Sequence, residues 1–152
     1  MNRLIAITIG DINGIGIEIL IKCWKNKNIK NFILITNIEI LKKYLKKNNI
    51  KLKINLINNK LKKLNFLKEK INVLSYDVKS LEDNTYKSLK FAYELCISKK
   101  CIGLITLPLR KDIIKNKIDK SFIGHTEFFQ KLDKKNFVNM ILFHKKIIIH
   151  HL

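Results

Sequence analysis

Two histidine-containing segments hold the side chains of this sequence that are best suited to binding chemistry. Gly124-His125-Thr126-Glu127 places an imidazole, a hydroxyl and a carboxylate in four consecutive residues, and His150-His151 immediately precedes Leu152. Imidazole binds divalent metals and anions and titrates near neutral pH. Because successive strand residues point to opposite faces, His150 and His151 cannot both face one pocket. The second segment therefore offers one histidine to any single site.

A structural explanation covers part of the first segment. Thr126 could cap the N-terminus of a following helix, and Glu127 would lie favourably in its first turn. That explanation leaves His125 without a role, although a lone histidine is more often structural or exposed than a ligand. A catalytic zinc site needs three protein ligands and an open position, and this sequence does not supply that set. No Ser-His-Asp or Cys-His nucleophile arrangement is evident either.

Two further segments follow apolar runs and are candidates for ligand binding. The loop from Gly10 to Gly16 lies between an expected strand and helix, where backbone N–H groups can receive an anion. Its glycines match neither G-x-G-x-x-G nor a P-loop, so a tight structural turn with Asp11 as its cap explains it equally well. Thr106 to Lys111 follows another strand, at the end where open α/β sheets bind ligands. A solvated turn with two cations remains the alternative there.

The elements that must position these residues alternate between strand and helix. Apolar, β-branched runs predict strands, and apolar residues spaced three and four apart predict helices. We expect strands over residues 4–9, 31–36, 51–57, 101–106, 137–143 and 147–150, and helices over residues 17–25, 38–47 and 81–98, with a surface connection over residues 58–70. This alternation predicts an α/β fold, layered α/β/α with a largely parallel sheet. No repeat or linker divides it, so one domain over residues 1–152 is expected.

The third helix has the most detailed prediction. Ser80-Leu81-Glu82-Asp83 resembles a capping box. Apolar and small residues then recur at helical spacing and predict a buried face made of Leu81, Thr85, Leu89, Ala92 and Cys96.

Composition limits the functional classes. A chain of 152 residues that is 47% hydrophobic can bury one core. The net charge of +19 comes almost entirely from lysine, since only Arg3 and Arg110 are arginine, and it resembles A/T-rich coding bias. Sequence-reading proteins favour arginine, so specific nucleic-acid binding is not expected. Three cysteines without a C-x-x-C pair fit a reducing cytoplasm, and no run is long enough to cross a membrane.

Taken together, three segments resemble the 4-hydroxythreonine-4-phosphate dehydrogenase family of vitamin B6 biosynthesis. They are residues 7–18, the turn from Thr106 to Lys111, and Gly124-His125-Thr126-Glu127, which match in order and spacing. The final His150-His151-Leu152 resembles the start of the family's Thr-Thr-His-Leu-Pro-Leu segment. The resemblance spans the whole chain but only about the first half of such an enzyme, so an isocitrate/isopropylmalate dehydrogenase-like fold, truncated, is implied.

The resemblance also implies an activity and site residues. Family members are oxidoreductases that use NAD or NADP to oxidise 4-phosphooxy-L-threonine, whose β-keto acid product decarboxylates to 3-amino-2-oxopropyl phosphate in pyridoxal phosphate biosynthesis. By this resemblance His125 and Thr126 contact the phosphorylated substrate. The resemblance further implies that His151 would be one of three histidines holding a divalent cation (zinc, magnesium or cobalt), and that the protein would be a cytoplasmic homodimer. No catalytic or cofactor-binding residue is assigned.

The sequence departs from the family pattern at several positions. Isoleucine stands at Ile12, Ile17 and Ile123, where the family has proline, and the Pro-Ile-Asn-Lys turn reads Pro108-Leu109-Arg110-Lys111. Proline presets φ, so less rigid loops are expected. With one of three metal histidines, little activity is expected from this chain alone, whether it requires a separate C-terminal half or is a shortened descendant. A non-catalytic binding or assembly protein on the same scaffold is the alternative.

Overall fold

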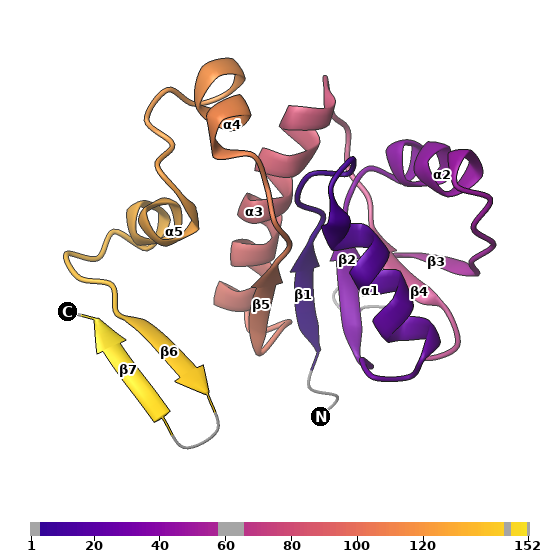
Figure 1. Cartoon of the computed structure of the whole chain (residues 1–152), viewed down its shortest axis with the longest axis horizontal. Helices are drawn as coiled ribbons and strands as arrows, with labels where there is room; N and C mark the ends of the chain where they lie inside the picture. Colours follow the sequence, from indigo (N-terminus) through magenta and orange to yellow (C-terminus); the bar gives the residue numbers. More distant parts are fainter. Residues whose placement is uncertain (1–3, 58–65, 145–146, 152) are drawn as a thin grey trace. The chain divides into compact units, whose positions relative to one another are not determined.

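The computed structural model describes residues 4–57, 66–144 and 147–151, and it describes side chains in the first two ranges. The chain divides into two compact units, Met1–Arg110 and Lys111–Leu152. Unit 1 holds a parallel sheet with helices, and unit 2 holds two helices and a hairpin (Figure 1).

Five short parallel strands form the sheet of unit 1. They are β1 (Ile5–Thr8), β2 (Phe32–Ile35), β3 (Ile54–Ile57), β4 (Ile71–Leu74) and β5 (Gly103–Thr106), in the order β3-β4-β2-β1-β5. On β1, Ile7 pairs with Leu34 of β2 on one side and with Ile105 of β5 on the other. The strand order therefore reverses at β1. In open α/β sheets the crevice beside such a reversal, at the carboxyl ends of the strands, is where ligands bind.

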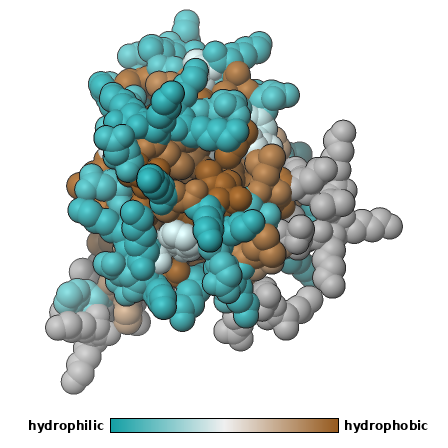
Figure 2. Space-filling view, turned by 90° about the vertical axis from the view of Figure 1, so that its right-hand side faces the viewer, coloured by the Kyte–Doolittle hydropathy of each residue, from teal (hydrophilic) through white to brown (hydrophobic). Residues whose placement is uncertain are grey.

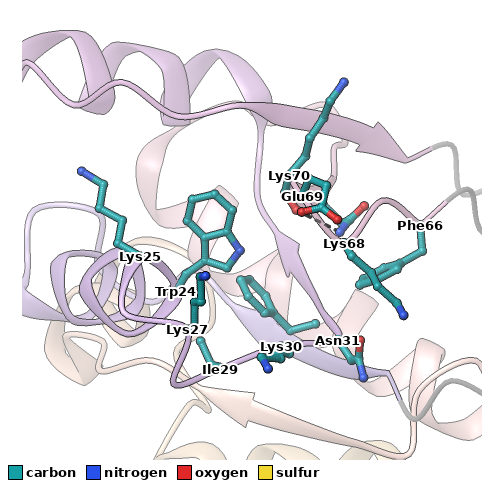
Figure 3. A pocket seen from close by; sticks show the side chains of 12 residues that line it. Trp24, Lys25, Lys27, Ile29, Lys30, Asn31, Phe66, Lys68, Glu69 and Lys70 are labelled. Atoms are coloured by element: carbon teal, nitrogen blue, oxygen red, sulfur yellow. Dashed lines mark hydrogen bonds between the residues drawn. The ribbon is translucent and has the colours of Figure 1, made fainter.

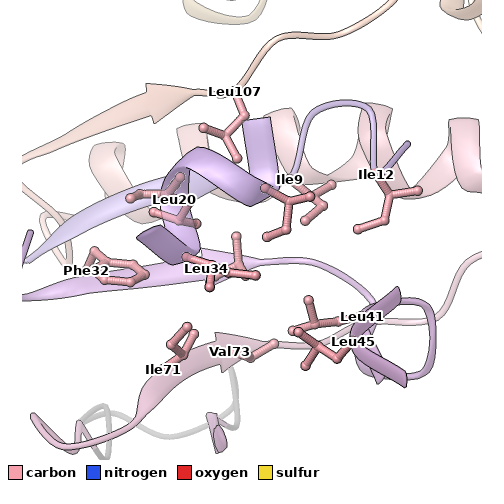
Figure 4. Close-up of a cluster of buried hydrophobic side chains, with 13 residues drawn as sticks. Ile9, Ile12, Leu20, Phe32, Leu34, Leu41, Leu45, Ile71, Val73 and Leu107 are labelled. Carbon is pink, nitrogen blue, oxygen red and sulfur yellow. The ribbon is translucent and has the colours of Figure 1, made fainter. Parts of the chain in front are cut away.

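Helices cover both faces of this sheet, as the alternating pattern predicted. They are α1 (Ile15–Lys25), α2 (Ile38–Lys47) and α3 (Leu81–Ile97). One core lies under α1 and α2 and includes Ile17, Leu41 and the strand residue Leu34 (Figure 4). The other lies under α3 and includes Ala92 and Ile33. Alternate residues of β2 thus enter opposite cores, because successive strand side chains point to opposite faces. The predicted α/β/α layering is confirmed.

One central strand was not predicted. β4 is buried along its whole length, yet Asn72 lies in the middle of it and weakens its apolar signal. The Asn72 side chain is only 3% exposed, and its amide accepts from the Leu67 backbone N–H and from the Asn55 side chain, both at 2.8 Å. It donates to the Leu67 and Lys70 carbonyls. A buried polar group that is fully hydrogen-bonded does not carry the usual desolvation penalty. Because both the oxygen and the nitrogen of its amide are hydrogen-bonded, Asn72 can occupy a core strand.

The two edge strands are more exposed than expected. β5 was predicted to be buried, but Ile105 is 42% exposed because no strand in the described part of the chain pairs with its outer edge. On β3 the predicted alternation is only partly kept, with Leu56 exposed and Ile57 buried. Figure 2 shows the side of the molecule that carries α2 and β3, where apolar surface gathers in the middle of a hydrophilic surround.

The third helix confirms its predicted cap and corrects two positions of its buried face, Leu81 and Cys96, the second of which is half-buried while Leu95 beside it is buried. The Ser80 hydroxyl accepts from the Asp83 backbone N–H at 3.1 Å, while the Asp83 carboxylate accepts from the Lys79 N–H at 2.9 Å. Leu81 is 43% exposed, because the first helical residue precedes the turn that reaches the sheet. The buried positions begin instead at Asn84 and Thr85.

Unit 2 contains α4 (Lys111–Lys117), α5 (His125–Asp133) and the antiparallel hairpin of β6 (Met140–His144) and β7 (Ile147–His151). Its apolar centre includes the rings of Phe122 and Phe128, whose centroids lie 5.7 Å apart. Both strands predicted near the end of the sequence are present, but they pair with each other in a separate sheet. Within the described ranges, no helix is long and apolar enough to cross a membrane.

Candidate functional site

The loop after β1 and the turn after β5 are brought together at the carboxyl edge of unit 1. Gly10 has φ of +63°, and a Cβ at this position would lie 2.4 Å from the Pro108 carbonyl oxygen. The Asp11 backbone N–H donates to that same oxygen at 2.8 Å. Only a residue without a side chain permits this approach, since backbone atoms cannot move aside. The structure thus joins two segments that the sequence had indicated only as separate candidates for ligand binding.

The Asp11 side chain caps its own loop, which was one of the two roles considered for it. Its carboxylate accepts from the Asn13 backbone N–H at 2.9 Å, which forms an Asx turn. Gly14 then caps α1 without any side-chain hydrogen bond. Ile12 and Ile17, which stand where the resemblance has proline, are 5% and 0% exposed, so side-chain burial anchors this loop.

A buried polar cluster on α3 holds the carboxyl edge of unit 1 in place. The Thr85 hydroxyl donates to the Gly10 carbonyl at 2.6 Å. The Asn84 amide donates to the Thr36 hydroxyl at 3.1 Å and accepts from the Asn37 backbone N–H at 2.8 Å. Asn84 was not among the residues predicted from the sequence. Its signal was a pair of adjacent polar residues, Asn84 and Thr85, on the face of a helix predicted to be buried.

In unit 2, Gly124-His125-Thr126-Glu127 forms the start of α5. The helix begins at His125, and Gly124 is its N-cap with extended backbone and no side-chain hydrogen bond. Thr126 is therefore the second helical residue, and the interpretation of Thr126 as the N-cap is wrong. Glu127 lies in the first turn, as expected. A helix start capped by glycine leaves backbone N–H groups available to an anion.

His125 and Lys111 converge at this helix start. His125 Nε2 is buried and has no hydrogen-bond partner among the described residues. A Cβ built on Gly124 would lie 3.3 Å from Lys111 Nζ and 2.9 Å from Glu127 Oε2, so both charged groups border the glycine. Buried polar atoms are rarely left unpaired, and the exceptions are often functional. An imidazole nitrogen and an ammonium at a helix N-terminus form an arrangement suited to a small anion.

The electrostatic setting keeps His125 neutral at neutral pH. Burial lowers the pKa of His125 below 6.5, the Lys111 ammonium lowers that pKa further, and the Glu127 carboxylate opposes both. A neutral imidazole can donate one hydrogen bond and accept one. Because the folded-state pKa lies below the unfolded value, the stability that neutral His125 contributes is present above about pH 6.5 and is lost as pH falls through the folded pKa.

Replacing Lys111 with glutamine is expected to raise the pKa of His125, because one of the two effects that lower it is removed. Glu127→Gln should shift the same pKa in the opposite direction, since the opposing carboxylate is lost. The ring Cε1–H resonance of His125, followed by NMR from pH 4 to 8 and assigned with His125→Asn, reports both shifts. Equal midpoints in all three proteins would show that neither charge acts on the imidazole.

The described residues do not form the predicted metal site. They contain no group of three His, Cys, Asp or Glu side chains that could hold a metal ion. His144 is exposed in β6. His151 lies in β7, but its side chain falls outside the described ones, so its role as a ligand stays a prediction.

Comparison with known proteins adds to this geometry. The family model of the pyridoxal phosphate biosynthetic protein PdxA matches residues 28–152. A curated relative from Wigglesworthia glossinidia brevipalpis, 4-hydroxythreonine-4-phosphate dehydrogenase, is 29% identical over 160 aligned positions, which cover 94% of this chain and 47% of the relative.

Solved structures of proteins with the same name share the fold. The Klebsiella pneumoniae 4-hydroxythreonine-4-phosphate dehydrogenase superposes with a TM-score of 0.83 at 23% identity, over 99% of this chain and 50% of that one. The Burkholderia phymatum protein gives a TM-score of 0.81 at 22% identity, over 99% of this chain and 49% of that one. This chain therefore spans about half the length of the relatives that it matches.

Proposed function

Because the chain belongs to the pyridoxal phosphate biosynthetic protein PdxA family, we propose that it serves 4-hydroxythreonine-4-phosphate dehydrogenase chemistry in pyridoxal phosphate biosynthesis. Its contribution is to bind the phosphorylated amino-acid substrate, 4-phosphooxy-L-threonine, in the cytoplasm. The relatives named for this activity, of which the chain spans about half, support the reaction class.

One observation carries the substrate assignment, namely that His125 Nε2, beside Lys111 at the start of α5, has no hydrogen-bond partner among the residues that the structure describes. A phosphate there would accept hydrogen bonds from the imidazole and from the backbone N–H groups of the first helical turn. The Lys111 ammonium would balance its charge. Thr126, in the same turn, would add its hydroxyl. These are the residues, His125 and Thr126, that the family resemblance had indicated, with Lys111 added by the structure.

Within this proposal the residues of the chain bind and orient the substrate. NAD or NADP, when bound, would accept the hydride that leaves the substrate carbon. Burial and the Lys111 ammonium lower the pKa of His125, so its imidazole is neutral and can accept a proton from a bound substrate hydroxyl. The described side chains contain no group of three that could hold a metal ion, and the glycine-rich loop does not match G-x-G-x-x-G. We therefore assign no described residue to binding the metal or the nicotinamide cofactor.

Binding of the phosphorylated substrate can be measured without turnover. We expect 4-phosphooxy-L-threonine to bind and to raise the pKa of His125, because a dianion favours the protonated imidazole. The same molecule without its phosphate should bind at least about tenfold more weakly, since a charge-assisted hydrogen bond contributes about 1.5–3 kcal/mol. Calorimetry gives the dissociation constants, and the NMR titration gives the pKa.

Variants distinguish binding at this specific site from general attraction of the anionic substrate to a basic protein. His125→Asn and Lys111→Gln should each weaken binding, whereas Lys115→Gln, on α4 but not among the groups that border Gly124, serves as the matched control. Equal loss in all three variants would contradict the site. Metal-dependent NAD reduction should be assayed in parallel, with and without a chain equivalent to the second half of the relatives. No turnover under either condition would overturn the enzymatic proposal and favour a non-catalytic role.

The exposed side chains of β6 support a role for a protein partner as well. Every residue of β6 is exposed, and Ile141, Leu142 and Phe143 are 60%, 57% and 70% exposed although they alternate between the two faces. Phe137, just before the strand, is 88% exposed. Contiguous apolar surface of this kind marks interaction sites. We propose that it packs against a second copy in a homodimer or against a segment equivalent to the second half of the relatives.

Sedimentation tests the partner proposal. We expect Phe143→Glu to abolish self-association or binding of the second half, because a charge would be buried in an apolar interface. Lys135→Glu, exposed and outside the hairpin, is the control for the added negative charge. A wild-type chain that stays monomeric and does not bind the second half would contradict the proposal.

A further inference from the structure

A second candidate binding site lies at the amino ends of the strands of unit 1, opposite the carboxyl ends where the loops after β1 and β5 meet. A cavity of about 630 Å³ opens beside the amino ends of β2 and β4. It is lined by the end of α1, the connection to β2, and the segment that enters β4 (Figure 3). Ligand pockets usually measure about 300–1,000 Å³, so a molecule of nucleotide size would fit. The loops after β1 and β5 end at the other edge, so this cavity is separate from them.

The walls of the cavity are aromatic and aliphatic. Trp24 and Phe66 are half-buried, Phe32 is 3% exposed, and Ile29 is half-buried beside them. Figure 3 shows the Trp24 ring contributed by α1 and the Phe66 ring contributed by the segment before β4. Aromatic faces arranged around one space can stack on a planar ring.

The rim of the cavity is positively charged. Five lining residues are lysine, namely Lys25, Lys27, Lys30, Lys68 and Lys70, and Glu69 is the single acidic one. Lysine makes up five of the twelve lining residues but 29 of the 152 residues of the chain. The lysines are thus concentrated here about twofold over the general composition. An ammonium on a flexible stem is a common binder of phosphate.

From these observations we propose that the cavity binds a nucleoside phosphate, with its base against Trp24 and its phosphates on the lysine rim. An apolar wall without the rim would favour a neutral ligand, and a rim without the wall would bind inorganic anions equally well. The combination selects a planar ring that carries phosphate. The Asn72 amide, already hydrogen-bonded four times, shapes the floor and is not counted as a ligand contact.

Trp24 makes the site directly observable, because it is the only tryptophan of the chain. Titration of the full chain with ADP should quench or shift its fluorescence, and calorimetry should give the same dissociation constant. Pyrophosphate should bind at least about fivefold more weakly, because it lacks the ring that stacks. ADP binding no tighter than pyrophosphate would overturn the proposal.

Charge-matched variants locate the binding. The triple variant Lys27→Gln, Lys30→Gln and Lys68→Gln should weaken ADP binding at least about tenfold, since charge-assisted contacts to phosphate are lost. The control Lys43→Gln, Lys46→Gln and Lys47→Gln removes the same charge from exposed positions of α2 and should change binding less than about twofold. Equal weakening would show general attraction by a basic surface and contradict the site. Circular dichroism checks that both variants fold, and Trp24→Phe, which keeps an aromatic ring, should bind by calorimetry without the fluorescence signal.

Discussion

Gly10→Ala is expected to lower the free energy of unfolding of unit 1 by about 2–5 kcal/mol. Two effects add at this position. The φ of +63° is strained for any residue with a Cβ, and that Cβ would lie 2.4 Å from the Pro108 oxygen and 2.8 Å from the Leu107 oxygen. Both obstacles are backbone atoms, so relief requires moving the loop away from the turn. The hydrogen bond from Asp11 to Pro108 would then lengthen.

Gly103→Ala is the matched control for this substitution. Nothing lies within 4 Å of a Cβ built at Gly103, which begins β5. Alanine is favoured over glycine in a strand by about 0.5–1 kcal/mol, so this variant should be unchanged or slightly more stable. Urea unfolding followed by Trp24 fluorescence measures both variants. A Gly10→Ala protein as stable as Gly103→Ala would show that the loop does not need its close approach to Pro108.

Asn84→Leu is expected to lower the free energy of unfolding by about 2–4 kcal/mol. Asn84 is 1% exposed, and leucine has the same branched skeleton of heavy atoms but is larger and can neither donate nor accept a hydrogen bond. The substitution leaves the Asn37 backbone N–H and the Thr36 hydroxyl without their partner on α3. Each buried group left unpaired carries its own desolvation penalty. Because Asn37 caps α2, the loss should also loosen the start of that helix.

Asn48→Leu supplies the comparison for Asn84→Leu. Asn48 is exposed at the end of α2, and its amide donates to the nearby Tyr44 carbonyl at 2.8 Å. We expect a change within about 0.5 kcal/mol, as for most surface substitutions. Hydrogen exchange should show faster exchange of the Asn37 and Ile38 amides in Asn84→Leu alone. Unchanged exchange at these amides would mean that the link from α3 does not stabilise the carboxyl edge.

Local sequence patterns predicted much of the fold because local contacts decide it. α2 begins and ends at the predicted residues, and Ser80 caps α3 as expected. The two strands that fill both cores, β1 and β2, stand out as β-branched runs between turn residues. β4 did not stand out, because the hydrogen bonds that satisfy Asn72 come from residues that no local pattern connects to it.

The features of the candidate site also fall into those that the sequence determined and those that only the tertiary structure decided. The sequence alone determined that a glycine-rich loop follows the first strand, that helix capping leaves His125 unexplained, and that the chain resembles one enzyme family. The tertiary structure alone decided that Thr85 hydrogen-bonds to Gly10, 75 residues away, and that Lys111 and Glu127 border Gly124 beside the unpaired His125 nitrogen. The physical reason is that helix starts and turns follow from neighbouring residues, whereas hydrogen bonds and charges between distant segments exist only once packing brings those segments together.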